Sequence, residues 1–241
     1  MFRNFIPALV LAGLSAPALA QDVASWSERI DPQALVQGTV ELDLHVAGET
    51  DGFMRFGWYT EGDVLHVWDR TMWPSQAVYE TYEARSDSGS LAPRGADIRF
   101  HQGDSYYTID VDFEPGRATG HLAGTTPGQP VVNQVIDTEL PEGTLLRAMI
   151  FVLAAVVPLE PGESISIDWY APMSNDVSPV TLSAAERVQI DTPGGRFDTI
   201  RLELRGGSPE NDIYVEPETR RIVRIDVEGQ PMQFLAPAET E

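Results

Sequence analysis

Most of the chain consists of short segments in which apolar and polar residues alternate. The clearest segment covers residues 40–46, where Val40, Leu42 and Leu44 alternate with charged residues. A period of two is typical of a β-strand with one buried face. The pattern recurs at residues 107–113, 165–169 and 200–205, with turns rich in glycine and proline between the segments. This spacing favours an antiparallel β fold over βαβ units.

Two hairpins are predicted with particular clarity. Residues 53–60 and 64–68 are joined by Glu61-Gly62-Asp63, and residues 212–216 are joined to 221–227 by a short turn. Short connections of this kind join neighbouring antiparallel strands. Residues 232–235 are expected to add an edge strand, and Asp31-Pro32 to start a short helical turn.

One stretch breaks the alternation. Leu145 to Leu159 is apolar or proline throughout except for Arg147, and the acidic, proline-containing residues 138–142 precede it. A segment that is apolar on all sides is typical of a buried helix. We therefore predict a mainly β fold in which a curved antiparallel sheet, or an incomplete β-barrel, wraps around one apolar helix at about 144–157. Arg147 is expected to reach a carboxylate or water.

The first twenty residues have the features of a secretory signal peptide. Arg3 gives a positive start, residues 5–16 an apolar core, and Ala18-Leu19-Ala20 a small-residue cleavage site. We expect cleavage after Ala20, a single β-rich domain over 21–235, and a disordered acidic tail over 236–241. The apolar run is shorter than the roughly 20 residues of a membrane span, so no transmembrane anchor is predicted.

Composition narrows the possible functions. The chain has no cysteine, which excludes disulfides and thiol catalysis. Its 16 basic residues are all arginine, against 37 acids, so the formal net charge is −21 and becomes −22 when Arg3 leaves with the signal. Such a charge repels phosphate backbones and argues against binding to nucleic acid. The absence of lysine removes Schiff-base and P-loop chemistry.

No arrangement of residues predicts a catalytic, cofactor or metal site. None of the 4 histidines has another at a ligand spacing. Glu41, Asp43 and His45 share one strand face, but zinc requires three or four converging ligands, so a solvated face is the preferred interpretation. Gly103-Asp104-Ser105 is similar to the start of a serine-esterase block, but without a nucleophile elbow we interpret it as a turn.

Two groups of side chains are candidates for binding. Aromatic residues crowd the early strands, and core filling is the simplest explanation for them. If a groove exists, our candidates for its lining are Trp58, Trp68, Phe100, Phe151 and Trp169. Arginines on the polar face of the late strands, Arg201, Arg205 and Arg224, are expected to form cross-strand ion pairs, with a docking patch as the alternative.

The second half of the chain resembles a known family. The resemblance rests on the apolar helix followed by Pro161-Gly162-Glu163, then Thr192-Pro193-Gly194-Gly195-Arg196-Phe197-Asp198, then Ile213-Tyr214-Val215-Glu216-Pro217-Glu218-Thr219-Arg220-Arg221. These motifs resemble exported bacterial proteins grouped as domain of unknown function 3108, whose members are similar in plan to the lipoprotein carriers LolA and LolB. The resemblance implies a periplasmic location and an incomplete barrel, and it implies no catalytic residue.

Three functional hypotheses follow. The first is a soluble periplasmic protein that holds a lipid, an acyl chain or a partner segment in an apolar groove without catalysis and acts in envelope maintenance. The second is a scaffold with a filled core that binds another envelope protein through its sheet surface. A hydrolase, with Ser105 as its nucleophile, is a remote third possibility. An apolar cavity of a few hundred Å³ would favour the first hypothesis over the second.

Overall fold

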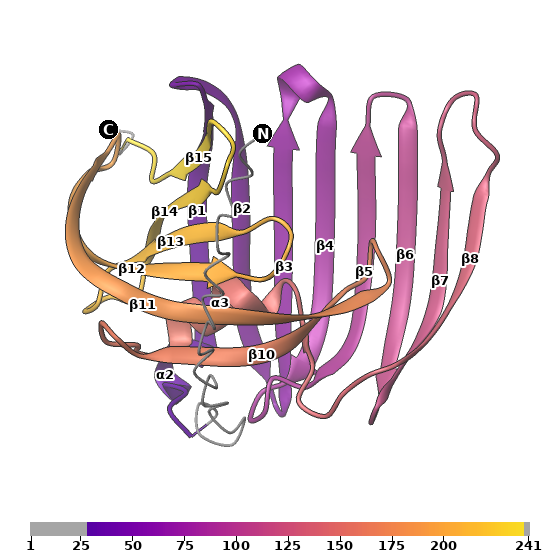
Figure 1. Cartoon of the computed structure of the whole chain (residues 1–241), viewed down its shortest axis with the longest axis horizontal. Helices are drawn as coiled ribbons and strands as arrows, with labels where there is room; N and C mark the ends of the chain where they lie inside the picture. The colour runs from indigo at the N-terminus through magenta and orange to yellow at the C-terminus, as the bar shows by residue number, and fades with distance from the viewer. Residues whose placement is uncertain (1–27, 239–241) are drawn as a thin grey trace, which may run out of the picture.

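The computed structural model describes residues 28–238, and its strands form one continuous, open sheet (Figure 1). The first half is an up-and-down meander in which each strand pairs with the next. It contains β1 (Gln37–Val46), β2 (Glu49–Glu61), β3 (Val64–Trp73), β4 (Val78–Asp87), β5 (Pro93–Gln102), β6 (Ser105–Glu114), β7 (Arg117–Thr125) and β8 (Val132–Glu139). The mainly β prediction is confirmed.

The second half is a further, mainly antiparallel series that curves across the first (Figure 1). It contains β9 (Leu145–Leu146), β10 (Ser164–Ala171), β11 (Asp176–Thr192), β12 (Gly195–Arg205), β13 (Asn211–Val215), β14 (Ile222–Val227) and β15 (Met232–Leu235). The sheet order is β8-β7-β6-β5-β4-β3-β2-β1-β15-β14-β13-β12-β11-β10-β9, with β8 and β9 at its two ends. The sheet is therefore open, as the predicted curved sheet or incomplete barrel requires.

Strand β15 is not at an edge, which corrects the sequence-based expectation. Leu44 of β1 pairs with Phe234 of β15, and Ile225 of β14 pairs with the same residue on the other side. The last strand thus joins the two halves of the sheet. Sequence alternation predicts that a strand exists, but the identity of its neighbours depends on contacts between distant parts of the chain.

The central helix α3 covers Met149–Val156, so it is shorter than the predicted 144–157. Leu145 and Leu146 instead pair in parallel with Trp169 and Tyr170 of β10. Arg147 continues this pairing, since its backbone N–H donates to the Tyr170 carbonyl over 3.0 Å. Residues 138–142 do not open the helix, because β8 continues to Glu139. A short apolar run does not distinguish a buried strand from a buried helix.

The helix is almost fully enclosed by the sheet. Val152, Leu153 and Ala154 have no exposed surface. Side chains at alternate positions of both halves of the sheet complete one apolar core around α3. Within residues 28–238, no helix is long and apolar enough to cross a membrane.

The C-terminal end of α3 is held by Arg220, which the sequence did not single out. Its guanidinium donates to the carbonyls of Ala154 (3.1 Å), Ala155 (2.9 Å) and Val157 (2.6 Å). The last carbonyls of a helix lack intrahelical partners, and a cation is favourable at this negative end. Burial lowers the pKa of Arg220. The β13–β14 turn thereby anchors the helix to the second half of the sheet.

Of the two short helical elements outside the sheet, one was predicted from the sequence and one was not. The predicted helical turn is present as α2 (Pro32–Val36), and Asp31 caps it by accepting the Gln33 N–H over 2.8 Å. A 3₁₀ turn, η1 (Pro74–Gln76), joins β3 to β4.

The C-terminal tail is more ordered at its start than predicted. The tail was expected to be disordered from residue 236, but Ala236 is fully buried and its N–H donates to Val223 over 2.8 Å. Residues 239–241 and the predicted signal peptide, 1–20, lie outside the described residues.

Candidate functional site

A cavity of about 260 Å³ lies between the first half of the sheet, the start of α3 and the second half of the sheet. We call it the inner cavity. Its apolar wall combines side chains from distant parts of the chain: Met54, Phe56, Val67, Ile98, Ala148, Ile150, Phe151, Ala171, Pro172, Met173, Ile225, Val227, Met232 and Phe234. Met173 is 38 % exposed, so this end of the wall borders solvent. The sheet therefore encloses α3 except where its residues Ile150 and Phe151, together with the preceding Ala148, face the cavity.

Two carboxyl groups enter the cavity from neighbouring strands. Asp69 of β3 pairs with Tyr82 of β4, and Thr71 pairs with Glu80, so all four side chains share one face of the sheet. This face also carries Val67 and is the buried face of β3. Asp69 accepts a hydrogen bond from the Thr71 hydroxyl over 2.9 Å. Asp69 and Glu80 therefore occupy strand positions whose side chains point into the core.

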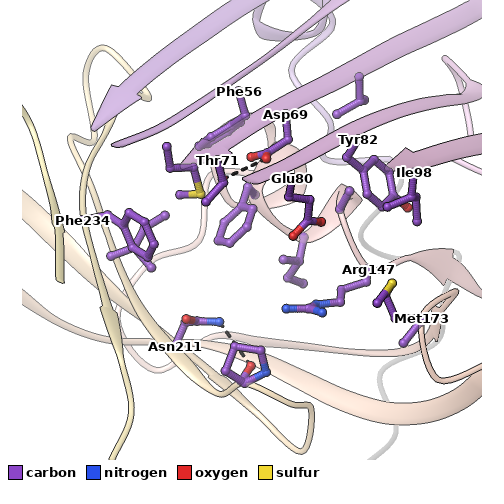
Figure 2. Close-up of a pocket in the computed structure, with 18 of the residues that line it drawn as sticks. Phe56, Asp69, Thr71, Glu80, Tyr82, Ile98, Arg147, Met173, Asn211 and Phe234 are labelled. Carbon is purple, nitrogen blue, oxygen red and sulfur yellow. Dashed lines mark hydrogen bonds between the residues drawn. The ribbon is translucent and has the colours of Figure 1, made fainter. Parts of the chain in front are cut away.

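Arg147 lies on the opposite wall, just before Ala148, the N-cap of α3. Its guanidinium is 5.8 Å from the centre of the Trp169 ring, a cation–π distance. Figure 2 shows Arg147 and Glu80 pointing toward one another across the cavity. No carboxylate oxygen in the described part of the chain lies within 4.0 Å of the guanidinium. The cation and the two acids thus face each other across a gap without forming an ion pair.

The surroundings of these groups change their acidity. Burial raises the pKa of Asp69 from 3.8 to about 7, and the nearby Glu80 charge adds to the effect, whereas Thr71 and the arginine charges oppose it. Burial also raises the pKa of Glu80, and Arg147 partly offsets this rise. A buried carboxylate is less stable than one in water, so its neutral form is favoured.

A further polar group in the wall has no protein partner. Tyr82 is 7 % exposed, and within residues 28–238 its hydroxyl has no hydrogen-bond partner. Burial is the main cause of its raised pKa, and the Glu80 charge contributes. A buried hydroxyl without a partner costs about 1–3 kcal/mol relative to one in water. Such groups commonly hold water or a ligand.

The structure brings two of the five candidate groove residues into the cavity as side chains. Phe151 contacts Phe56 at 5.4 Å between ring centres, and Trp169 lies beneath Arg147. Trp68 is also among the residues that border the cavity, but its ring packs over Gly57 of the neighbouring strand. A Cβ atom added to Gly57 would lie 2.7 Å from this ring. Because Gly57 lies between the buried Phe56 and Trp58, this ring is on the outer face of the sheet.

The remaining two candidates lie outside the wall. Trp58 is buried near α2 and donates from its indole to the Ala34 carbonyl over 2.9 Å. Phe100 lies beyond Ile98 on β5, with its ring 6.5 Å from that of Tyr107. Both therefore belong to the packing of the sheet and not to the lining of the cavity.

The three candidate docking arginines all engage acids. Arg201 is 3.0 Å from Asp212 and 2.9 Å from Glu203, and Arg205 is 2.6 Å from Asp212. Arg224 is 2.7 Å from Asp226. Their charges are thus largely neutralised by cross-strand and same-strand partners, as the ion-pair interpretation expects.

The weaker chemical candidates remain isolated. Within residues 28–238, no three side chains of the His, Asp or Glu type converge as metal ligands, and Glu41, Asp43 and His45 are no exception. Ser105 is the first residue of β6, directly after the Gly103–Asp104 turn. No hydrogen bond joins its hydroxyl to a histidine in the described chain.

Asp69, Glu80 and Tyr82 were not among the site residues predicted from the sequence. A usable signal was present, because Asp69 continues the apolar positions Leu65 and Val67 at a period of two. Glu80 likewise shares its strand face with Tyr82 and Ala84. An acid at a position where the period predicts the core suggests a buried functional group.

Residues 44–230 match the model of a family described as "Protein of unknown function (DUF3108)". The match covers most of the chain, including every strand from β2 to β14 and all lining residues of the inner cavity except Met232 and Phe234. Comparison with curated proteins and with solved structures found no match. The expected likeness to LolA and LolB therefore stays a prediction.

Proposed function

The chain belongs to the DUF3108 family of proteins of unknown function, and on that premise we propose that it is an exported, non-catalytic carrier that holds one apolar chain in the inner cavity. The observation that supports this most is the cavity of about 260 Å³ with a mainly apolar wall. Its wall closes only when both halves of the sheet and α3 are in place. Folding thus builds a pocket beside a helix that is otherwise fully covered.

The expected affinity comes from apolar surface removed from water, at about 25 cal/mol per Å². Part of this gain is offset by the ordering of the ligand, so a micromolar affinity is a reasonable expectation for a single short chain. The strongly negative surface would keep such a carrier away from anionic membrane surfaces between loading and release. A periplasmic location and a role in envelope maintenance belong to the same proposal.

The test is a titration with the neutral fluorescent probe N-phenylnaphthylamine, whose emission rises in apolar surroundings. The wild-type protein is compared with Ala148→Phe, which places a ring in the cavity. The matched control is Ala123→Phe, on the exposed face of β7. We expect saturable binding at one site in the wild type and the control, and a loss of at least about tenfold in Ala148→Phe. Equal binding by all three proteins would refute the proposed site.

A scaffold function is the second candidate, and two observations favour it. The cavity is slightly smaller than the 300 Å³ at which ligand pockets usually begin. The terminal strand β8 also carries two valines, Val135 on the strand and Val131 just before it, that are 66 % and 70 % exposed. An exposed edge of this kind can pair with a strand of another protein. Under this alternative the wild type would fail to bind the probe.

A further inference from the structure

We propose that the ligand of the inner cavity carries, beside its apolar chain, one neutral group that both donates and accepts hydrogen bonds, such as a carboxamide or an alcohol. This inference rests on the proposed carrier function and specifies its ligand class. It is carried by the polar groups that converge on one end of the cavity. They are the Asp69 and Glu80 carboxyls, the Tyr82 hydroxyl and the Arg147 guanidinium.

The polar groups are not satisfied by one another. In the described chain, Glu80 and the Arg147 guanidinium make no hydrogen bond or ion pair, and the Tyr82 hydroxyl has no partner. The one internal bond is that from Thr71 to Asp69. A purely apolar ligand would remove water from Glu80 and Arg147 and would leave the Tyr82 hydroxyl unpaired, which is unfavourable.

The arrangement also disfavours a ligand with a single charge. An anion such as a carboxylate would attract Arg147 but would lie beside Asp69 and Glu80. A cation such as an ammonium group would satisfy the acids but would lie against Arg147. A like charge in a poorly solvated site costs more than the same pair in water.

A neutral group with both functions meets every requirement. Its oxygen accepts from the Arg147 guanidinium, and its N–H or O–H donates to Glu80 or Asp69 across the gap. The Tyr82 hydroxyl can take either role, because a phenol both donates and accepts. Trp169 and Phe151 then flank the first carbons of the chain, since both rings border the same space.

The experiment compares ligands that share one chain and differ only in the polar end. Decanamide, decanol, decanoate and decylammonium each displace N-phenylnaphthylamine from the intact protein at pH 7.5. We expect decanamide and decanol to compete at least about tenfold more strongly than either charged ligand. Equal competition by all four, or preference for a charged ligand, would overturn the inference while leaving the carrier function in place. Competition by none would overturn both, and would mean that the polar groups hold water only.

Two variants test the assignment of roles. Arg147→Met removes the cation and is expected to raise the affinity for decylammonium. Glu80→Gln removes one acid and is expected to raise the affinity for decanoate. The control is Glu83→Gln on the same strand, because Glu83 lies on the outer face in an ion pair with Arg70 at 2.5 Å. Thermal unfolding checks that each variant is folded, and unchanged ligand preferences in folded variants would contradict the inference.

Discussion

Replacement of Asp69 by asparagine should stabilise the protein, and the gain should depend on pH. Asparagine keeps the acceptor for the Thr71 hydroxyl, which is 2.9 Å from the carboxylate oxygen, and removes the negative charge. Asp69 has a pKa of about 7 in the folded chain, against 3.8 for the ordinary carboxyl. The folded state thus holds a proton that the unfolded state releases throughout this interval.

The sign of the effect follows from that difference. Stability falls as the pH rises from about 3.8 to about 7, because the unfolded state then binds fewer protons than the folded state. Above pH 7 the full cost of the buried charge is present, about 4 kcal/mol at 1.36 kcal/mol per pH unit. At pH 4.5 the free-energy cost of the buried carboxyl group is only about 1 kcal/mol, because the folded state is then largely protonated. Water in the cavity would reduce both figures, so they are upper values.

The assay is urea unfolding, followed by far-ultraviolet circular dichroism between pH 4.5 and pH 8. We expect Asp69→Asn to exceed the wild type in stability by several times more at pH 8 than at pH 4.5. Asp104→Asn, in the exposed β5–β6 turn, serves as the control and should follow the wild type. A gain that is the same at both pH values, or a loss at pH 8, would refute the assignment of a buried acid to this site.

Two further predictions concern packing around the cavity. Arg220→Met should lower stability by about 2–4 kcal/mol, because three carbonyls at the end of α3 lose a charged donor. Arg196→Met, which removes only an exposed ion pair with Asp191, should change it little, and equal effects in chemical unfolding would contradict the capping role. Gly207→Ala should cost about 1–3 kcal/mol, since the new Cβ would lie 2.2 Å from the Trp169 ring. Gly89→Ala, with its nearest neighbour at 3.5 Å, is the control, and unchanged thermal stability of Gly207→Ala would contradict this packing.

The strands were predictable because their period is local. The alternation at residues 40–46 or 200–205 identifies a buried and an exposed face without reference to the rest of the fold. The hairpins at residues 61–63 and 216–221 are equally local, because the turn residues lie between their own strands. The overall class followed from these segments alone.

The positions that depend on distant partners were less predictable. Leu145 and Leu146 join β10, and not the helix, because the backbone of Trp169 and Tyr170 lies beside them. Likewise β15 lies in the middle of the sheet because it pairs with β1 on one side and with β14 on the other. No pattern within a strand of four residues specifies that placement.

The candidate site shows the same division. Phe151 and Trp169 were found because aromatic residues in apolar segments attract attention, whereas Asp69 and Glu80 were not considered as candidates. The two-residue period of each strand predicts that these side chains point to the core. That β3, β4 and Arg147 meet at one cavity is seen only in the folded structure. Trp58 and Phe100 illustrate the converse, since both share the aromatic character but pack away from the cavity.

The most direct test of the central claim is native mass spectrometry of the protein purified without detergent from the cells that naturally produce it. If the inner cavity is a carrier site, the wild type and Ala123→Phe should each carry one organic molecule per chain, and Ala148→Phe should be empty. Extraction and fragmentation of that molecule should show an apolar chain with a neutral polar group. A wild-type protein that is consistently empty and that also fails to bind N-phenylnaphthylamine would contradict the account.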